Sequence, residues 1–255
     1  MKKYKQYYEY ASQISSIVGS FLKKDFGKSF KMTHKIDSHY GIENDITANK
    51  MYEDYLREKT PEIALYTEEG EKNLNSDLVW VIDPIEGTSN YRAGNPFWAT
   101  TICLIYKNEP QLSIVNAPIL NQVFFAIKGS GAFLNGEKIK ISNVDNLKLA
   151  LVDIGRGTKV EDKDWYINTL IKLRDFIRTN RTFGACGLDI SYCAAGITDV
   201  YMNSGSQIYD NLAGSLLVSE AGGVVKNFRG LDWSLKDKDF LASNQKLADD
   251  IIKLL

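Results

Sequence analysis

The sequence predicts a layered protein in which helices pack on β-sheets, with an α+β first half and an α/β second half. Between residues 98 and 141, short apolar segments follow one another across connections short enough for hairpins. From about residue 145 onward, strand-like and helix-like segments alternate, which is typical of an α/β arrangement. A chain of 255 residues fits one large domain or two modest ones. We therefore expect domains at 1–145 and 146–255, without a flexible linker.

Two helices are expected near the N-terminus. Apolar side chains between residues 4 and 24 recur on one face at helical spacing. Residues 25–44 read as irregular or extended. A second helix is expected at 45–59, because Thr60-Pro61 disfavours its continuation. The residues expected to face inward from this helix are Ala48, Met51 and Tyr55.

An antiparallel meander is expected to follow the helices. Asn135-Gly136 is a strong two-residue hairpin signal between two of its last segments. The strands are expected at 63–66, 78–82, 98–106, 111–117, 122–127, 132–134 and 138–141.

The second half is expected to alternate between strands and helices. Asn244 is a residue type that caps helices, so it predicts the start of the last helix, which runs to Leu255. The strands are expected at 149–154, 199–202, 224–225 and 240–242, and the other helices at 162–178, 188–195 and 211–221.

The composition of the chain excludes several classes of partner and of catalytic site. The net charge is −1 and there is no basic block, so nucleic acid is not an expected partner. No apolar run is long enough for a membrane helix, and three cysteines without a signal peptide suit the cytoplasm. The chain has only two histidines, His34 and His39, which excludes a histidine-rich zinc site. Catalysis would therefore depend on carboxylates, with or without a metal.

Acidic residues stand where strands end. Glu68 follows one strand, and Asp83 and Glu86 follow another. Asp83 comes directly after an apolar run, so its charge needs compensation. Asp210 precedes an apolar helix, where it could also serve as a helix cap. Carboxylate oxygens suit Mg²⁺, and the amides of the Gly-Thr-Ser turn after Glu86 can face an anion.

The stretch Trp-Val-Ile-Asp-Pro-Ile-Glu-Gly-Thr, residues 80–88, resembles the D-P-[IL]-D-G-T signature of the inositol monophosphatase family. Thr67-Glu68-Glu69 looks like the family's G-E-E. Tyr209-Asp210 with Ala213-Gly214 looks like its second signature, W-D-x-A-G. The resemblance covers nearly the whole chain. It implies a layered αβαβα sandwich and a magnesium-dependent, lithium-sensitive phosphatase that forms a homodimer or homotetramer.

The resemblance also implies roles for individual residues. It implies two or three Mg²⁺ ions, for which Mn²⁺ could substitute. Their ligands would be Glu68, Asp83, the backbone carbonyl of Ile85, Glu86 and Asp210. The amides of Gly87 and Thr88 would hold the phosphate. The Thr88 side chain and Asp45 would orient the attacking water.

The chain departs from the family pattern in several places. Glu86 replaces the usual Asp of the signature. No Thr precedes Asp45, and an alternative register through 46–48 would put Lys50 at the catalytic position. Asn203 stands where inositol-specific members have a Glu that contacts a substrate hydroxyl. Arg156 could meet a second phosphate or a sugar hydroxyl, or lie in a solvated loop.

The predicted function is hydrolysis of a phosphorylated sugar or polyol by a metal-activated water. The substrate would be inositol 1-phosphate, fructose 1,6-bisphosphate or both, as in the dual-specificity microbial members that the chain resembles. Two alternatives remain open. One is a phosphatase for 3′-phosphoadenosine 5′-phosphate or histidinol phosphate. The other is a catalytically weak, metal-binding family member that acts through protein contacts.

Overall fold

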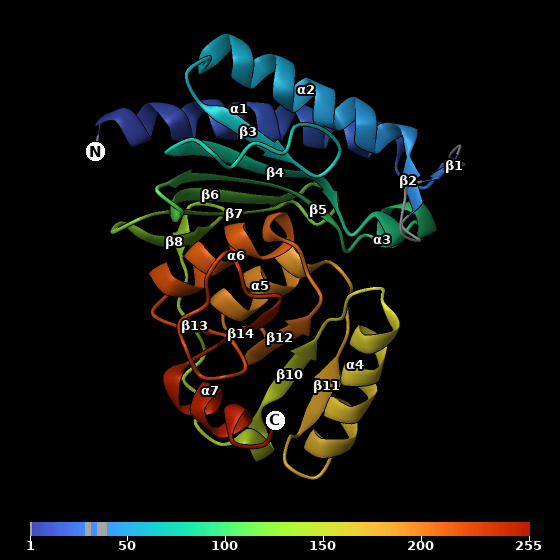
Figure 1. Ribbon diagram of the computed structural model, residues 1–255, viewed down its shortest axis with the longest axis vertical. Coiled ribbons are helices and arrows are strands. Elements are labelled where there is room, and N and C mark those ends of the chain that lie inside the picture. Colours follow the sequence, from blue (N-terminus) through green and yellow to red (C-terminus); the bar gives the residue numbers. More distant parts are fainter. Residues whose placement is uncertain (1, 29–31, 35–39) are drawn as a thin grey trace.

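The computed structural model describes residues 2–28, 32–34 and 40–255 and has the predicted five-layer αβαβα arrangement (Figure 1). In Figure 1 the layers are stacked from the top of the view to the bottom. A helical layer covers a seven-stranded sheet, two helices separate that sheet from a five-stranded one, and further helices cover the far side. The three helical layers are α1 (Lys2–Asp25) with α2 (Glu43–Lys59), α5 (Cys186–Ala194) with α6 (Ile208–Glu220), and α4 (Val160–Leu173) with α7 (Gln245–Ile252).

The first sheet is the expected meander with one parallel edge strand. Its strands follow chain order, and every neighbouring pair is antiparallel except the first. At the last hairpin, Asn135 and Gly136 have φ of 50° and 88°, as a tight two-residue turn requires. The strands are β3 (Ala64–Thr67), β4 (Leu78–Glu86), β5 (Ala99–Tyr106), β6 (Glu109–Ala117), β7 (Gln122–Ile127), β8 (Gly131–Leu134) and β9 (Glu137–Lys138).

Helix α2 buries a different face from the one expected. Its buried apolar residues are Ala48, Tyr52 and Leu56, whereas Met51 and Tyr55 are only half-buried. These three recur every four residues, so they form one stripe against the sheet. The Tyr52 hydroxyl also bonds to Ser15 Oγ on α1 at 3.2 Å, which explains why a polar aromatic residue is tolerated there.

The segment expected to be irregular or extended contains a small strand pair. Strands β1 (Met32–His34) and β2 (Tyr40–Ile42) are antiparallel, and α2 begins directly after them. The rest of that segment at 29–31 and 35–39, with His39, lies outside the described residues.

The second sheet has the order β11-β10-β12-β14-β13 and mixes parallel and antiparallel pairs. The prediction of a helix to residue 178 was wrong, because α4 ends at Leu173 and residues 179–181 form a strand parallel to β10. The prediction also missed that strand, which depends on pairing with its neighbour rather than on a local sequence pattern. A 3₁₀ turn, Leu147–Leu149, precedes the sheet. Its strands are β10 (Leu151–Ile154), β11 (Thr179–Arg181), β12 (Val200–Ser204), β13 (Val224–Lys226) and β14 (Asp239–Ser243).

Helices α5 and α6 join the two sheets. Both contact strands of the first sheet and strands of the second, and their apolar residues belong to one continuous core. The domain boundary near residue 145 stays a prediction. Within the part of the chain that the structure describes, no helix is both long and apolar enough to span a bilayer.

Candidate active site

Strand β4 carries Asp83 and Glu86 within its length rather than beyond its end. The strand was expected to stop at Ile82, but it pairs with β5 through Asp83↔Thr101 and again through Glu86↔Ala99. The register shifts between these two pairs, which is a β-bulge. Pro84 lies in this bulge, where its missing N–H costs no ladder hydrogen bond. The bulge therefore places two carboxylates on one short piece of backbone.

Three carboxylates meet between the first sheet and α6. One oxygen from each of Asp83, Glu86 and Asp210 lies within 4.8 Å of one from each of the others. Asp83 and Glu86 are 2% and 4% exposed, and Asp210, in the first turn of α6, is half-buried. The Asp210 carboxylate also accepts a 2.6 Å hydrogen bond from the amide of Gln207, which fixes its side chain.

Burial and mutual repulsion raise the pKa of every carboxyl group in this cluster. Burial, followed by the charges of Glu68, Glu86 and Asp210, raises the pKa of Asp83 well above its ordinary value. Burial and Asp210 raise the pKa of Glu86 to about 8. Burial raises the pKa of Asp210 to about 7. The cluster therefore holds protons near neutral pH unless a cation replaces them.

Glu68 is the fourth acid at this place. It lies at the carboxyl end of β3, and its amide donates to the Ile82 carbonyl of β4 at 3.0 Å. Its side chain is partly exposed, and a hydrogen bond with Asp83 adds to the rise in the pKa of Asp83. Glu68 thus stands at the rim of the cluster while Asp83 lies inside it.

The donor set fits a hard divalent cation. Asp83 Oδ1 is buried and has no hydrogen-bond partner among the described residues, so the protein around it leaves this oxygen uncompensated. All four side chains in the group offer carboxylate oxygens, which Mg²⁺ prefers. These residues would hold the ion that the sequence predicts.

Glu86 uses its longer arm to reach α5. Its Oε2 accepts a 2.7 Å hydrogen bond from the Gly187 amide, and the amides of Cys186 and Leu188 also favour its charged form. A Cβ at Gly187 would lie 2.9 Å from Thr101 Cγ2, so only glycine fits there without a shift. No sequence pattern indicates this contact, since its partners are 101 residues apart.

Gly87 and Thr88 form a tight turn after the bulge. Gly87 has φ 87° and ψ 40° and precedes α3 (Thr88–Ala93). A Cβ at Gly87 would lie 2.9 Å from the Ala185 Cβ, so the turn packs directly on the segment before α5. Thr88 Oγ1 donates to the Ile85 carbonyl at 3.0 Å. That carbonyl keeps a second lone pair for another partner.

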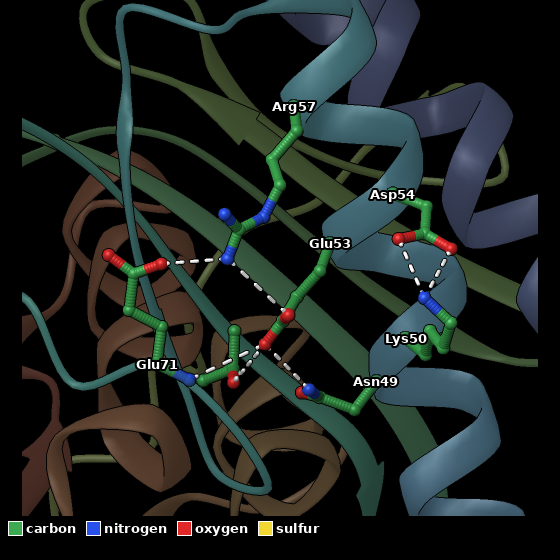
Figure 2. Close-up of polar contacts among 7 residues, drawn as sticks. Asn49, Lys50, Glu53, Asp54, Arg57 and Glu71 are labelled. Carbon is green, nitrogen blue, oxygen red and sulfur yellow. Dashed lines mark hydrogen bonds and ion pairs between the residues drawn. The ribbon is translucent and has the colours of Figure 1, made fainter.

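Asp45 lies fully buried in the first turn of α2. Burial is the largest cause of the raised pKa of Tyr91 on α3, and the charge of Asp45 adds to it. Asp45 and Thr88 thus come from neighbouring elements. Lys50 is exposed and pairs with Asp54 at 2.9 Å (Figure 2). It lies on the solvent side of α2, so the structure favours the register that uses Asp45.

Two predicted substrate contacts, Asn203 and Arg156, have partners within the protein. Asn203 is fully buried, and its amide donates to Tyr201 Oη at 2.8 Å and to Asn211 Oδ1 at 3.1 Å. Asn203 thus braces the start of α6, and its contact with a substrate stays a prediction. The exposed Arg156 guanidinium lies 6.0 Å from the ring centroid of Tyr166 on α4. It fits the alternative of a solvated loop.

A second acidic pair, which sequence reasoning missed, lies behind the segment before α5. Asp153 on β10 and Asp189 on α5 are both fully buried, and they lie close enough to share a hydrogen bond once one of them is protonated. Asp189 Oδ2 also accepts from the Ala185 amide at 3.2 Å. Burial raises the pKa of Asp153 to about 7 and that of Asp189 well above its ordinary value. Only three-dimensional contact could reveal the pair, because each residue alone looks like an ordinary surface acid.

We expect Asp153→Asn to stabilise the protein at pH 8 by about 2 kcal/mol. The folded-state pKa of Asp153 is raised, so the wild type loses stability as pH rises from about 4 towards 7. Asparagine can still donate to Asp189 and does not titrate. Urea unfolding at pH 5 and pH 8 measures the gain, which should shrink at pH 5. The exposed Asp164→Asn is the control, and an equal effect from both variants would contradict the expectation.

The five layers and the acid cluster together match the class of layered phosphatases that the sequence resembles. The model of the inositol monophosphatase family matches residues 3–255. The chain therefore belongs to the inositol monophosphatase family.

Relatives agree with this assignment. A Thermotoga maritima protein named fructose-1,6-bisphosphatase/inositol-1-monophosphatase is 34% identical over 215 residues, covering 84% of this chain and 81% of that protein. The Xylella fastidiosa Nus factor SuhB is 33% identical over 216 residues, covering 83% and 78%. Among solved structures, the Thermotoga maritima IMPase superposes with a TM-score of 0.91 at 29% identity, covering 100% of this chain and 96% of that one.

Proposed function

We propose that the protein is a magnesium-dependent phosphatase of sugar or polyol phosphates. Membership in the inositol monophosphatase family supports a phosphatase. The observation that carries the metal dependence is the cluster of Asp83, Glu86 and Asp210. Their carboxylates lie together, and one buried oxygen of Asp83 has no hydrogen-bond partner among the described residues. Bound Mg²⁺ would neutralise phosphate oxygens and lower the pKa of a water molecule.

The chain's own residues would supply the binding and the orientation. Asp83, Glu86 and Asp210 form a largely buried group of carboxyl side chains, with Glu68 at its rim. The Gly87 turn holds its backbone amides beside this site, where they could orient a phosphate. Thr88 and the buried Asp45 would orient the attacking water. Phosphoryl transfer requires mainly positioning and charge stabilisation, so a site without histidine is sufficient.

Inositol 1-phosphate and fructose 1,6-bisphosphate are the proposed substrates. The Thermotoga maritima relative carries both activities in its name. This chain has Asn203 where inositol-specific members have a Glu that contacts a substrate hydroxyl, which is consistent with broad acceptance. The homodimer or homotetramer, the sensitivity to lithium and the cytoplasmic location stay predictions.

Phosphate release over a substrate panel tests the proposal. The panel contains inositol 1-phosphate, fructose 1,6-bisphosphate, 3′-phosphoadenosine 5′-phosphate and histidinol phosphate, each with Mg²⁺, with Mn²⁺ and with EDTA. We expect metal-dependent turnover on the first two substrates. Preference for either of the last two substrates would contradict the proposed substrate class. Turnover that EDTA does not reduce would contradict the proposed metal dependence.

A second candidate is a role through protein contacts with little catalysis. Relatives named Nus factor SuhB favour it, since that name describes something other than a phosphatase. Glu86 in place of Asp also favours it, because one of its oxygens is engaged by the amide of Gly187. No metal-dependent turnover on any substrate of the panel, from a protein that still binds Mg²⁺, would support this candidate.

A further inference from the structure

The loop that follows Glu68 is held tightly at both ends. Strand β3 is the edge of its sheet, and the chain after it folds straight back. The Thr67 amide donates to the Glu71 carbonyl at 2.7 Å, and the Asn73 amide donates to the Leu65 carbonyl at 3.1 Å. Residues 67–73, here called the Glu68 loop, therefore form a short closed turn whose position decides where Glu68 lies.

Glu53 on α2 anchors one side of this loop (Figure 2). Its side chain is only 19% exposed, although it carries a charge. Its Oε1 accepts from Asn49 Nδ2 at 2.9 Å, and from Thr67 Oγ1 and the Glu71 amide at 3.4 Å each. Arg57 then joins both acids, lying 3.6 Å from Glu53 and 2.8 Å from Glu71.

Gly70 allows the loop backbone to approach this carboxylate. A Cβ at Gly70 would lie 2.0 Å from Glu53 Oε1 and 2.6 Å from Asn49 Nδ2. No side chain fits in that space unless Glu53 moves. The Glu68 loop is therefore fitted to the Glu53 carboxylate by shape as well as by hydrogen bonds.

Lys72 anchors the other side of the loop to α6. Its ammonium donates to the Thr67 and Glu68 carbonyls at 2.6 and 2.9 Å. It also lies 5.1 Å from the ring centroid of Tyr66 and 4.9 Å from that of Tyr209. Tyr209 immediately precedes Asp210, so Lys72 connects the backbone of one acid of the site to the neighbour of another.

We propose that Glu53 and Lys72 are positioning residues that fix Glu68 relative to Asp83 and Asp210, Glu53 from α2 and Lys72 from α6. Neither residue belongs to the acid cluster itself, and both bond to the Glu68 loop. This inference rests on the proposed function, because it assigns Glu68 a place beside a bound cation. It gives a role to a mostly buried Glu and to a lysine that lies beside two aromatic rings.

Calorimetric titration of the full chain with Mg²⁺ tests Glu53 against a matched control. Glu53→Gln keeps the shape of the side chain and removes its charge, and we expect Mg²⁺ affinity to fall about tenfold. Asp54→Asn removes the same charge from the next residue of the same helix, where Asp54 pairs with exposed Lys50 at 2.9 Å. The control should change affinity less than about twofold. Equal affinities for the two variants would overturn the role of Glu53.

For Lys72→Met, two explanations of the role of Lys72 predict opposite changes in Mg²⁺ affinity. If Lys72 acted only as a nearby positive charge, its removal would tighten Mg²⁺ binding. If it positions Glu68, removal weakens binding, again by about tenfold. Lys72→Arg should retain most of the affinity, and Lys107→Met, which removes a lysine 5.4 Å from the Tyr106 ring, should change nothing. Tighter binding in Lys72→Met would overturn the positioning role.

Amide hydrogen exchange of the metal-free proteins separates this inference from the proposed function. Both Glu53→Gln and Lys72→Met should speed exchange at the Thr67 and Glu71 amides, while the sheet core stays protected. If the wild type bound no Mg²⁺, the proposed metal dependence would fail, and exchange would still decide whether these residues hold the loop. Unchanged exchange in both variants would overturn the inference.

Discussion

Asp83→Asn is expected to lower magnesium-dependent phosphate release by at least about a thousandfold, because a bound metal supplies several kcal/mol of the required stabilisation. Asp83 is the most buried acid of the cluster, and its Oδ1 has no hydrogen-bond partner in the part of the chain that the structure describes. An amide in its place offers a weaker ligand and no charge. Phosphate release at saturating Mg²⁺ measures the loss, and Asp77→Asn, an exposed acid just before the same strand, serves as the control.

Although Asp83→Asn should lose activity, we expect it to lose no stability in the absence of metal. The pKa of Asp83 is raised in the folded state, so the metal-free wild type loses stability as pH rises above the ordinary aspartate value. The substituted asparagine carries no such cost, and metal-free Asp83→Asn should be at least as stable as the wild type at pH 8. Mg²⁺ at a hundred times its Kd should stabilise only the wild type, by about 2.7 kcal/mol. Metal-dependent turnover that survives in Asp83→Asn would remove the proposed site.

Gly87→Ala is expected to destabilise the protein by about 3 kcal/mol and to stop turnover. Its φ of 87° is unfavourable for alanine, and the new methyl group would lie 2.9 Å from the Ala185 Cβ. To relieve this close contact, the turn at Gly87 would have to move away from Ala185, which directly precedes α5. Glu86 is the residue before Gly87 and accepts a hydrogen bond from Gly187 on α5, so the movement would also displace Glu86.

Gly136→Ala provides a matched control for the backbone alone. Gly136 has φ 88°, but no atom of the described residues beyond its chain neighbours lies within 4 Å of its added Cβ. Gly136→Ala should therefore lower the free energy of unfolding only by the strain of the left-handed conformation, about 1 kcal/mol. Urea unfolding of both variants isolates the contribution of the close contact. Equal losses would show that Ala185 can move aside and that the turn is not tightly packed.

Sequence reasoning placed most elements of the first sheet because hairpin signals are local. Asn135-Gly136 predicts a tight turn from two adjacent residues, and the structure has that turn. The predicted end of α4 was wrong because the helix stops at Leu173 and the chain turns towards β11. That strand forms only by pairing with β10, so it has no local sequence signal. The burial of Tyr52 was missed because Tyr52 and Tyr55 look alike in sequence, and only contacts in the folded chain, such as the bond to Ser15 on another helix, distinguish them.

The candidate site followed the same division between local and distant signals. Asp83, Glu86 and Asp210 were predicted from two sequence signatures, and the structure brings their oxygens together. The bond from Gly187 to Glu86, the pair of Asp153 with Asp189, and the hold of Glu53 on the Glu68 loop had no sequence signal. Each joins residues whose types look ordinary until the chain has folded, so no local pattern could show them.

The placement of Glu86 against α5 also bears on how the molecule reaches its native state. The two partners are 101 residues apart, and Asp210 follows later still. Contacts of such long range form late, after the loop entropy of the intervening chain has been lost. The meander can pair its strands earlier, through hairpins. A cation bound by the finished cluster would then act after the rate-limiting step, so it would slow unfolding much more than it would speed folding.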